Sequence, residues 1–146
     1  SKKQAQGFID AYYRANPEIP LYQDAISDEA VRTRTLRSPI LGRLRLFYGR
    51  ENEIRGEACN FPIQSTAADI INSSFIRMTS RFRRGGFVVQ VHDSIIVEVP
   101  TSYMNECIDI VREEMEQPVL LDGNMIKFPI ELKTGQRWSE LKTLKG

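Results

Sequence analysis

The stretch from residue 87 to residue 99 most constrains the fold, because two short apolar runs there flank a single polar turn. Residues 87–91 and 95–99 are rich in β-branched side chains, and only His92, Asp93 and Ser94 separate them. Apolar runs of this length with so short a connection are typical of a β-hairpin. The chain therefore contains paired strands, with a histidine and an aspartate at or near their turn.

Apolar residues follow helical spacing over much of the remaining chain. The pattern predicts helices over residues 2–15, 20–31, 51–83 and 100–116. Pro62 falls inside the third pattern, where it is expected to kink or restart the helix. Alternating residues predict further strands over 33–36, 43–47 and 127–133.

These elements predict an α+β fold. The strands are few and the helices can cover them, so we expect an antiparallel sheet with helices packed on one face. The other face is then free for a partner or substrate. Trp138 is expected to pack in a core or against a sheet edge.

Charge is nearly balanced in number but segregated along the chain. Lys and Arg total 20 against 19 Asp and Glu, so the net charge gives no hint of a nucleic-acid partner. However, residues 32–50 contain no acid and hold six arginines: Arg32, Arg34, Arg37, Arg43, Arg45 and Arg50. A nearly neutral protein with such a segment can still present a basic face.

Cysteine content and hydropathy favour a location inside the cell. Cys59 and Cys107 are far apart and match neither a disulfide framework nor a zinc-binding pattern. No apolar run approaches the ~20 residues that a membrane helix needs. We therefore expect a cytoplasmic protein without a membrane partner.

The His92–Asp93 turn has both a structural and a functional interpretation. An aspartate in a turn commonly accepts hydrogen bonds from nearby backbone N–H groups, and a single histidine is more often structural than catalytic. A stiff, buried pair of apolar strands would, however, be a good support for a group that needs accurate placement. A buried carboxylate with no second charge beside it would also require a cation or a metal.

Four segments resemble family A DNA polymerases, the group of bacterial DNA polymerase I and many phage replicases. Residues 90–100, QVHDSIIVEVP, resemble the last conserved motif of that family. Residues 60–71, NFPIQSTAADII, look like the helix that precedes this motif, at the right spacing. Residues 129–142, PIELKTGQRWSELK, resemble the C-terminal segment, and residues 1–19 resemble the helix that follows the fingers. The resemblance implies that residues 1–146 form one incomplete domain, the C-terminal palm segment of a phage-type polymerase.

The resemblance also implies a metal site. Family A palms use two Mg²⁺ ions held by two aspartates, which activate the primer 3′-hydroxyl and stabilise the leaving pyrophosphate. By this resemblance Asp93 is one of the metal ligands, and His92 lies close to the primer terminus as a second catalytic residue. Ser94 stands where bacterial members usually have glutamate, which puts the fine metal geometry in doubt.

The same resemblance implies a surface for primer–template DNA. Gln64 and Asn60 would face the minor groove near the last base pair, where amides reach acceptors that every base pair shows. Arg43 and Arg45 would contact phosphates, and Arg55 is a further candidate whose register matches less cleanly. The simpler alternatives are that Gln64 caps the helix after Pro62 and that the arginine strand is a solvated face.

Other parts of the family pattern are absent from these residues. The second metal aspartate and the fingers helix that binds the deoxynucleoside triphosphate belong to earlier motifs. The chain is therefore expected to be inactive alone. It would be completed by a partner polypeptide that carries the remaining palm, the fingers and the thumb, or by the rest of a longer chain. The alternative is a non-catalytic DNA-binding or scaffold remnant of a palm. An unrelated metal hydrolase fits poorly, because no second ligand cluster accompanies Asp93 and His92 at recognisable spacing.

Overall fold

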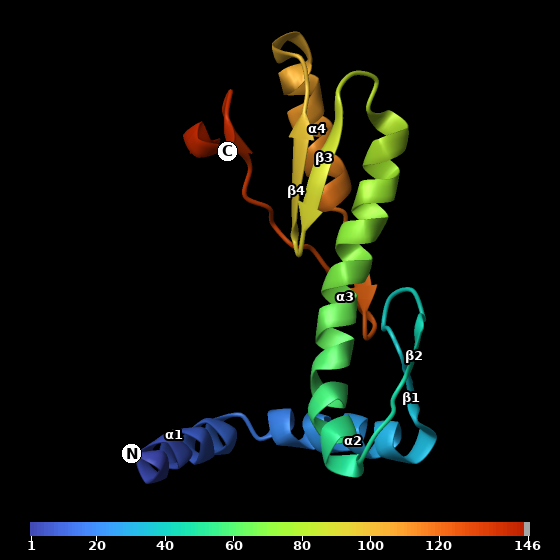
Figure 1. The fold of residues 1–146 in the computed structure, drawn as a ribbon, viewed down its shortest axis with the longest axis vertical. Helices are drawn as coiled ribbons and strands as arrows, with labels where there is room; N and C mark the ends of the chain where they lie inside the picture. Colours follow the sequence, from blue (N-terminus) through green and yellow to red (C-terminus); the bar gives the residue numbers. More distant parts are fainter. Residues whose placement is uncertain (145–146) are drawn as a thin grey trace. The chain divides into compact units, whose positions relative to one another are not determined.

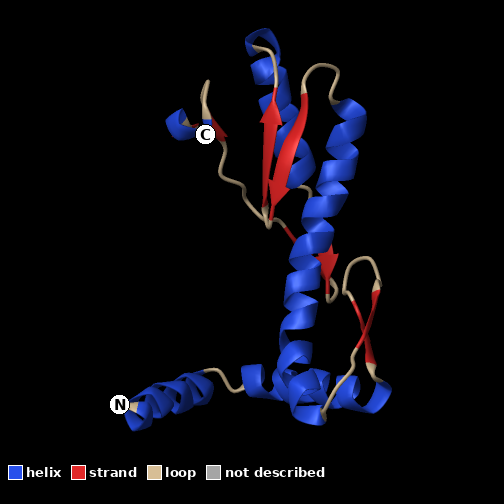
Figure 2. Ribbon diagram, viewed as in Figure 1, coloured by secondary structure: helices blue, strands red, loops and turns tan. Residues whose placement is uncertain are grey.

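The computed structural model describes residues 1–144 and divides the chain into two compact units. The first unit is Ser1–Ser65, and the second begins at Thr66. Helix α3 (Glu51–Arg81) contributes residues to both units. The last two residues of the predicted segment 1–146 lie outside the described residues. Figure 1 follows the chain from its N-terminus to its C-terminus by colour, and Figure 2 distinguishes the helices from the strands.

The first unit contains two helices, a short hairpin and the first half of α3. Its elements are α1 (Lys2–Ala15), α2 (Glu18–Thr33), β1 (Thr35–Arg37) and β2 (Leu44–Leu46). Ser1 begins α1 with a reciprocal capping box to Gln4, and Arg34 ends α2 in the left-handed conformation, at φ 59°. Both helices and the strand–turn–strand segment are therefore confirmed.

The second unit contains helices and three hairpins. Its elements are β3 (Gly86–Val91), β4 (Ser94–Glu98), the 3₁₀ helix η1 (Thr101–Tyr103), α4 (Met104–Met115), β5 (Val119–Leu121), β6 (Asn124–Ile126), β7 (Lys133–Thr134), η2 (Trp138–Glu140) and β8 (Lys142–Thr143). Among residues 1–144, every strand pairs only with the partner in its own antiparallel hairpin. The α+β class is confirmed, built from small antiparallel sheets.

Residues 127–132 form no strand, so the strand predicted over 127–133 was wrong. The turn Asp122–Gly123 instead joins β5 to β6, and the chain pairs again only from Lys133. Pro129 has no N–H to donate to a ladder, which disfavours pairing across this stretch.

Helix α3 continues through Pro62 as one element of 31 residues. Of the two predicted alternatives, a kink or a restart at Pro62, the restart was therefore wrong. The proline ring removes one backbone hydrogen bond, to the carbonyl of Ala58, but not those on either side. Because Pro62 and its neighbours Ala58 and Ser65 are buried, packing of this face outweighs the local penalty.

Each unit has its own core. The first packs α2, β1 and α3 through Ala30, Leu36, Phe47, Ile54 and Ala58. The second packs the C-terminal half of α3 against η1 and α4 through Met78, Tyr103, Cys107, Ile110 and Val111, with half-buried residues of β3 and β4 against this cluster. Trp138 is 68% exposed and packs in neither core, so of its two predicted roles the core role was wrong. It lies between β7 and β8, which pair over only two residues each.

The charged network around Glu114 ties α3 to α4 in the second unit. The Glu114 side chain is 8% exposed, and its carboxylate accepts hydrogen bonds from Arg77 at 2.8 Å and Arg81 at 2.7 Å. Gln117 donates a further bond at 2.8 Å. Hydrogen bonding to Arg81, and then to Arg77, lowers the pKa of Glu114.

We expect Glu114→Gln to lower the free energy of unfolding by about 2 kcal/mol at neutral pH. Breaking a buried pair costs ~3–5 kcal/mol, but both guanidinium groups are more than one-third exposed, so water can solvate them. Because folding lowers this pKa, the carboxylate stabilises the fold above its ordinary pKa near 4.5, and this contribution is lost as the pH falls through the lowered value. The gap between wild type and variant should therefore close in acid, as measured by urea unfolding at several pH values.

Glu113→Gln is the matched control for this prediction. Glu113 also pairs with Arg81, at 2.7 Å, but its side chain is 62% exposed. An exposed pair contributes at most about 1 kcal/mol, so this variant should stay close to wild type. Equal losses in the two variants would contradict the assigned role of Glu114.

In the part of the chain that the structure describes, we find no helix with the length and apolar character needed to cross a bilayer.

Candidate active site

The turn between β3 and β4 is a two-residue loop. Val91 pairs with Ser94, which leaves only His92 and Asp93 between the strands. The Ser94 hydroxyl donates a hydrogen bond of 2.9 Å to the Val91 carbonyl oxygen and closes the turn. All three residues from His92 to Ser94 are exposed, and the strands behind them are at most half-buried. The expected buried pair of strands is therefore only half-buried here, and the argument for a cation from a buried carboxylate does not apply to this exposed turn.

The backbone at His92 is strained. Its φ of 53° lies in the left-handed region, which costs a residue other than glycine about 1–2 kcal/mol. The β5–β6 hairpin has the same loop length but carries Asp122–Gly123, both with positive φ, a combination well suited to such turns. The first hairpin thus keeps a histidine where glycine would be less strained. Such strain often marks a functional position.

The carboxylate of Asp93 is suited to binding a hard cation. It is exposed on a closed turn, and no side chain within residues 1–144 is hydrogen-bonded to it. Carboxylate oxygens are preferred ligands of Mg²⁺. Within the same residues, no three His, Cys, Asp or Glu side chains gather into a metal-binding group. The turn thus fits a site in which Asp93 provides one ligand and other molecules or segments provide the rest.

Asn60 and Gln64 lie on one face of α3. They are four residues apart, both are exposed, and Ile63 beside them is 60% exposed. Pro62 and Ser65 point to the buried side of the helix. Since α3 is continuous here, Gln64 does not cap a helix after Pro62, and that alternative fails. Both amides remain available to an external partner.

Arg45 lies beside this part of α3. Its guanidinium pairs with the Glu57 carboxylate at 2.5 Å and lies 5.0 Å from the Phe47 ring centre and 5.6 Å from that of Phe61. These contacts hold the strand arginine against the helix turn next to Asn60. The Arg45 side chain remains 43% exposed, so it can still meet an anion. It is therefore not merely a solvated side chain.

Arg43 and Arg55 occupy different settings. Arg43 stands just before β2, where its backbone N–H donates to the Ser38 hydroxyl at 3.0 Å. Arg55 pairs with Asp28 at 2.6 Å and with Glu51 at 3.1 Å, joining α2 to α3. Hydrogen bonds to these two carboxylates raise the pKa of Arg55. A phosphate at Arg55 would have to compete with both acids.

The predicted residues fall into two groups, one in each unit. The second unit holds the turn with His92 and Asp93, and the first unit holds Asn60, Gln64, Arg43, Arg45 and Arg55. Sequence reasoning missed one contact close to the turn, in which Gln90 of β3 donates a 3.2 Å hydrogen bond to Asn72 of α3. No periodic pattern connects two positions 18 residues apart, so only the structure reveals this link.

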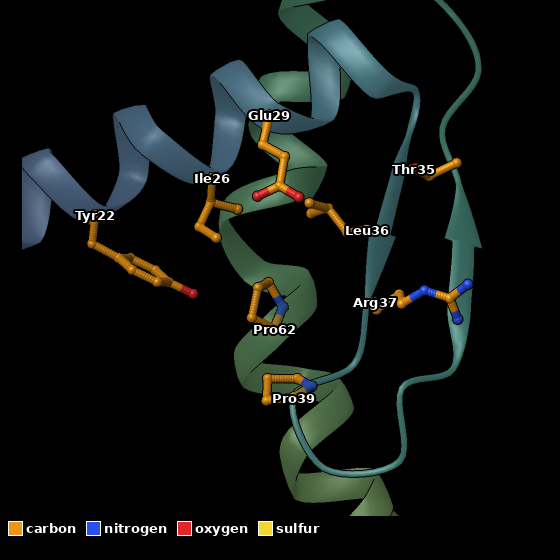
Figure 3. A pocket seen from close by; sticks show the side chains of 8 residues that line it. All are labelled: Tyr22, Ile26, Glu29, Thr35, Leu36, Arg37, Pro39 and Pro62. Atoms are coloured by element: carbon orange, nitrogen blue, oxygen red, sulfur yellow. The ribbon is translucent and has the colours of Figure 1, made fainter. Parts of the chain in front are cut away.

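A cavity of about 400 Å³ in the first unit is separate from the predicted residues. Figure 3 shows the side chains of α2, β1, the hairpin turn and α3 that line it: Tyr22, Ile26, Glu29, Thr35, Leu36, Arg37, Pro39 and Pro62. Burial raises the pKa of Tyr22. None of the predicted catalytic or DNA-binding residues lines this cavity.

Comparisons with a family model and with known proteins identify the same family. Residues 1–140 match the model of DNA polymerase family A. DNA polymerase I of Streptococcus pneumoniae is 33% identical over 152 residues, and the thermostable DNA polymerase I of Thermus filiformis is 29% identical over 149. These alignments cover 97% and 96% of this chain, but each covers only 17% of the relative.

A solved structure shows the same fold. The polymerase domain of Pol1 from M. smegmatis, in complex with a DNA primer–template and a deoxynucleoside triphosphate, matches with a TM-score of 0.71. The two sequences are 27% identical, and the match covers 80% of this chain and 22% of that one. The motif of residues 90–100 and the helix before it thus lie within a chain-long match to one family. The chain belongs to DNA polymerase family A.

Proposed function

We propose that this chain is the C-terminal palm segment of a DNA-directed DNA polymerase and contributes Asp93 to nucleotidyl transfer. It works as part of a longer chain or of a split, phage-type enzyme in the cytoplasm of a bacterial or phage-infected cell. The observation that carries the proposal is the His92–Asp93 turn, an exposed carboxylate on a closed and strained loop in a family A chain. The bacterial relatives support this setting.

Asp93 is proposed to hold Mg²⁺ together with a second carboxylate from outside this chain. Bound there, Mg²⁺ supplies activation of the primer 3′-hydroxyl and charge stabilisation of the leaving pyrophosphate. The short loop and the Ser94–Val91 hydrogen bond restrict the direction of the Asp93 carboxylate. His92, the preceding loop residue, is proposed to contact the primer terminus and orient the reacting end.

The first unit is proposed to contact primer–template DNA. Asn60 and Gln64 offer two amides on one exposed helix face, suited to minor-groove acceptors that do not depend on sequence. Arg45, with Arg43 and Arg55 as further candidates, is proposed to contact phosphates. The M. smegmatis structure contains both primer–template DNA and a deoxynucleoside triphosphate, which supports these ligands for the complete enzyme here.

Primer extension tests the proposal. The chain is assayed with Mg²⁺ and deoxynucleotides, alone and mixed with the polypeptide that carries the earlier family A motifs. We expect primer extension only in the mixture. A mixture that forms a complex but adds no nucleotide would refute the catalytic role and leave a DNA-binding or scaffold remnant.

We expect Gln64→Ala to weaken primer–template binding up to about tenfold in the active mixture, because one hydrogen bond contributes roughly 0.5–1.5 kcal/mol. Arg45→Ala should weaken binding to all sequences alike and reduce the slope of log affinity against log salt by about one. Fluorescence anisotropy at several salt concentrations measures both effects.

Asn52→Ala and Arg32→Ala are the controls for these two variants. Asn52 is an exposed amide elsewhere on α3, and Arg32 is an exposed arginine near the end of α2. Neither belongs to the proposed surface, so affinity and salt slope should both stay at their wild-type values. Losses as large as those of Gln64→Ala and Arg45→Ala would argue against a localised DNA surface.

A further inference from the structure

A side-chain hydrogen bond joins strand β3 to helix α3 just behind the His92–Asp93 turn. The Gln90 side-chain amide donates to the side-chain carbonyl oxygen of Asn72 at 3.2 Å. Gln90 is the second-last residue of β3, and Asn72 lies in the part of α3 that belongs to the second unit. The bond therefore connects the strand that leads into the turn to a helix of the same compact unit.

An irregularity in β3 turns Gln90 toward α3. The register runs from Phe87 opposite Val97 to Gln90 opposite Ile95, so β3 takes three steps where β4 takes two. Phe87, Ile95 and Val97 pack against the core that α3 and α4 share. Side chains directly opposite each other in an antiparallel pair lie on one face, so Gln90 shares the face of Ile95. In a regular strand, alternation would place Phe87 and Gln90 on opposite faces. The extra residue thus re-aims Gln90, and bulges with this effect are frequent next to active sites.

The turn ahead of Gln90 needs support from its surroundings. His92 has a φ of 53°, and a strained conformation of this kind persists only where neighbouring contacts fix it. The Ser94 hydroxyl bonds to the Val91 carbonyl oxygen within the hairpin, which closes the turn but does not attach it to a helix. The Gln90–Asn72 bond provides such an attachment.

The other end of β3 is held by apolar packing. The Phe87 ring lies with its centre 5.0 Å from that of Phe82 and 4.2 Å from that of Phe75. The strand is therefore attached at its start by aromatic rings and near its end by the Gln90–Asn72 bond. Loss of the amide bond would leave the turn end of β3 without this polar attachment, so the tip could move relative to α3.

The bond is expected to affect position more than stability. Both side chains are exposed, so water can replace the partner of each amide when the bond breaks. Catalytic groups, by contrast, must stay within about 0.5 Å of the productive geometry. A contact that contributes little to the free energy of unfolding can therefore still control the placement of His92 and Asp93.

We infer that Asn72 is a positioning residue for nucleotide addition, which acts through Gln90 to hold the His92–Asp93 turn. The inference rests on the proposed function, since it concerns the turn to which nucleotidyl transfer is assigned. The role of Asn72 is to orient β3, and not to contact the reacting groups.

Backbone ¹⁵N relaxation of the whole chain tests the positional step without any activity. The amides of His92 and Asp93 should have order parameters of about 0.85 in wild type and below about 0.6 in Asn72→Leu, which removes the acceptor. Asn105→Leu is the matched control, because Asn105 is an exposed amide on α4 of the same unit. The control should leave the order parameters unchanged, and neither variant should shift the thermal unfolding midpoint.

Single-turnover extension in the completed polymerase tests the catalytic step. Asn72→Leu and Gln90→Met should each lower the rate constant of nucleotide addition about tenfold, since a small misplacement of reacting groups can cost about 100-fold. The Kd for primer–template should change less than about twofold. The double variant should be no slower than either single variant, because both changes remove the same bond. Asn72→Asp, which keeps an acceptor for the Gln90 amide, should recover most of the rate.

Three results would overturn the inference: unchanged order parameters in Asn72→Leu, a loss of primer–template affinity as large as the loss of rate, or additive losses in the double variant. The second result would mean that the pair contacts DNA directly. The proposed function fails differently. In that case the turn becomes mobile in Asn72→Leu, yet the completed wild-type complex adds no nucleotide.

Discussion

Replacing Asp93 by alanine should lower the rate of nucleotide addition at least about 1,000-fold in the completed polymerase. Loss of one preorganised charge-stabilising group commonly costs 10²–10³ in rate, and a metal ligand acts on both the attacking and the leaving oxygen. The fold should be unaffected, because Asp93 is exposed and no described side chain bonds to it. Single-turnover extension and thermal unfolding measure the two effects separately.

Asp122→Ala is the matched control for Asp93→Ala. Asp122 is also exposed, occupies a two-residue hairpin loop and has positive φ in its own turn. Its removal should leave extension unchanged. If both variants kept full activity, Asp93 would not be a metal ligand, and if both lost it, the loss would reflect charge rather than a specific site.

Replacing Gly85 by alanine should lower the free energy of unfolding by at least about 3 kcal/mol. Gly85 joins α3 to β3 with φ of 80°, a conformation that strains other residues. A Cβ would overlap the Glu98 carbonyl oxygen and lie 2.8 Å from both Cα and Cγ1 of Val99. Because these are mainly backbone atoms of the paired strand, relief requires moving the hairpin itself. Urea unfolding measures the loss.

Gly86→Ala is the neighbouring control. A Cβ at Gly86 has nothing within 4 Å, and its φ is not positive, so the change should stay within about 1 kcal/mol of wild type. Equal free energies of unfolding for the two variants would contradict the positive φ and the close contacts of Gly85, where the chain passes from α3 to β3. Since Gly85 begins the hairpin that carries Asp93, its variant should also lose extension activity.

Local signals in the sequence were sufficient where one segment determines its own structure. The helix over residues 2–15 follows from its apolar spacing and its Asn16–Pro17 end, and the hairpin follows from its two apolar runs. Local signals failed where packing or a neighbouring turn determines the structure of a segment. Pro62 is carried within α3 because its surroundings are buried, and the turn at Asp122–Gly123 places β5 and β6 before the strand predicted over 127–133.

The sequence predicts where the candidate site residues lie in the secondary structure, but it does not predict their surroundings. The motif of residues 90–100 places Asp93 at the turn, yet apolar strands on either side do not reveal that the tip is exposed. The pairing of Arg45 with Glu57, of Arg55 with Asp28 and of Gln90 with Asn72 joins segments 12 to 27 residues apart. No spacing rule links such positions. Only the structure therefore shows which arginines already pair with a carboxylate and how exposed each one remains.

Metal rescue of Asp93→Cys in the completed polymerase distinguishes a metal ligand from any other role of Asp93. Mg²⁺ prefers hard oxygen ligands, whereas softer ions such as Mn²⁺ and especially Cd²⁺ accept a thiolate. We predict that the variant binds primer–template normally, adds no nucleotide with Mg²⁺, and regains part of its activity with the softer ions. Wild-type activity with Mg²⁺, or equal inactivity with all three metals despite normal DNA binding, would contradict a metal ligand at Asp93.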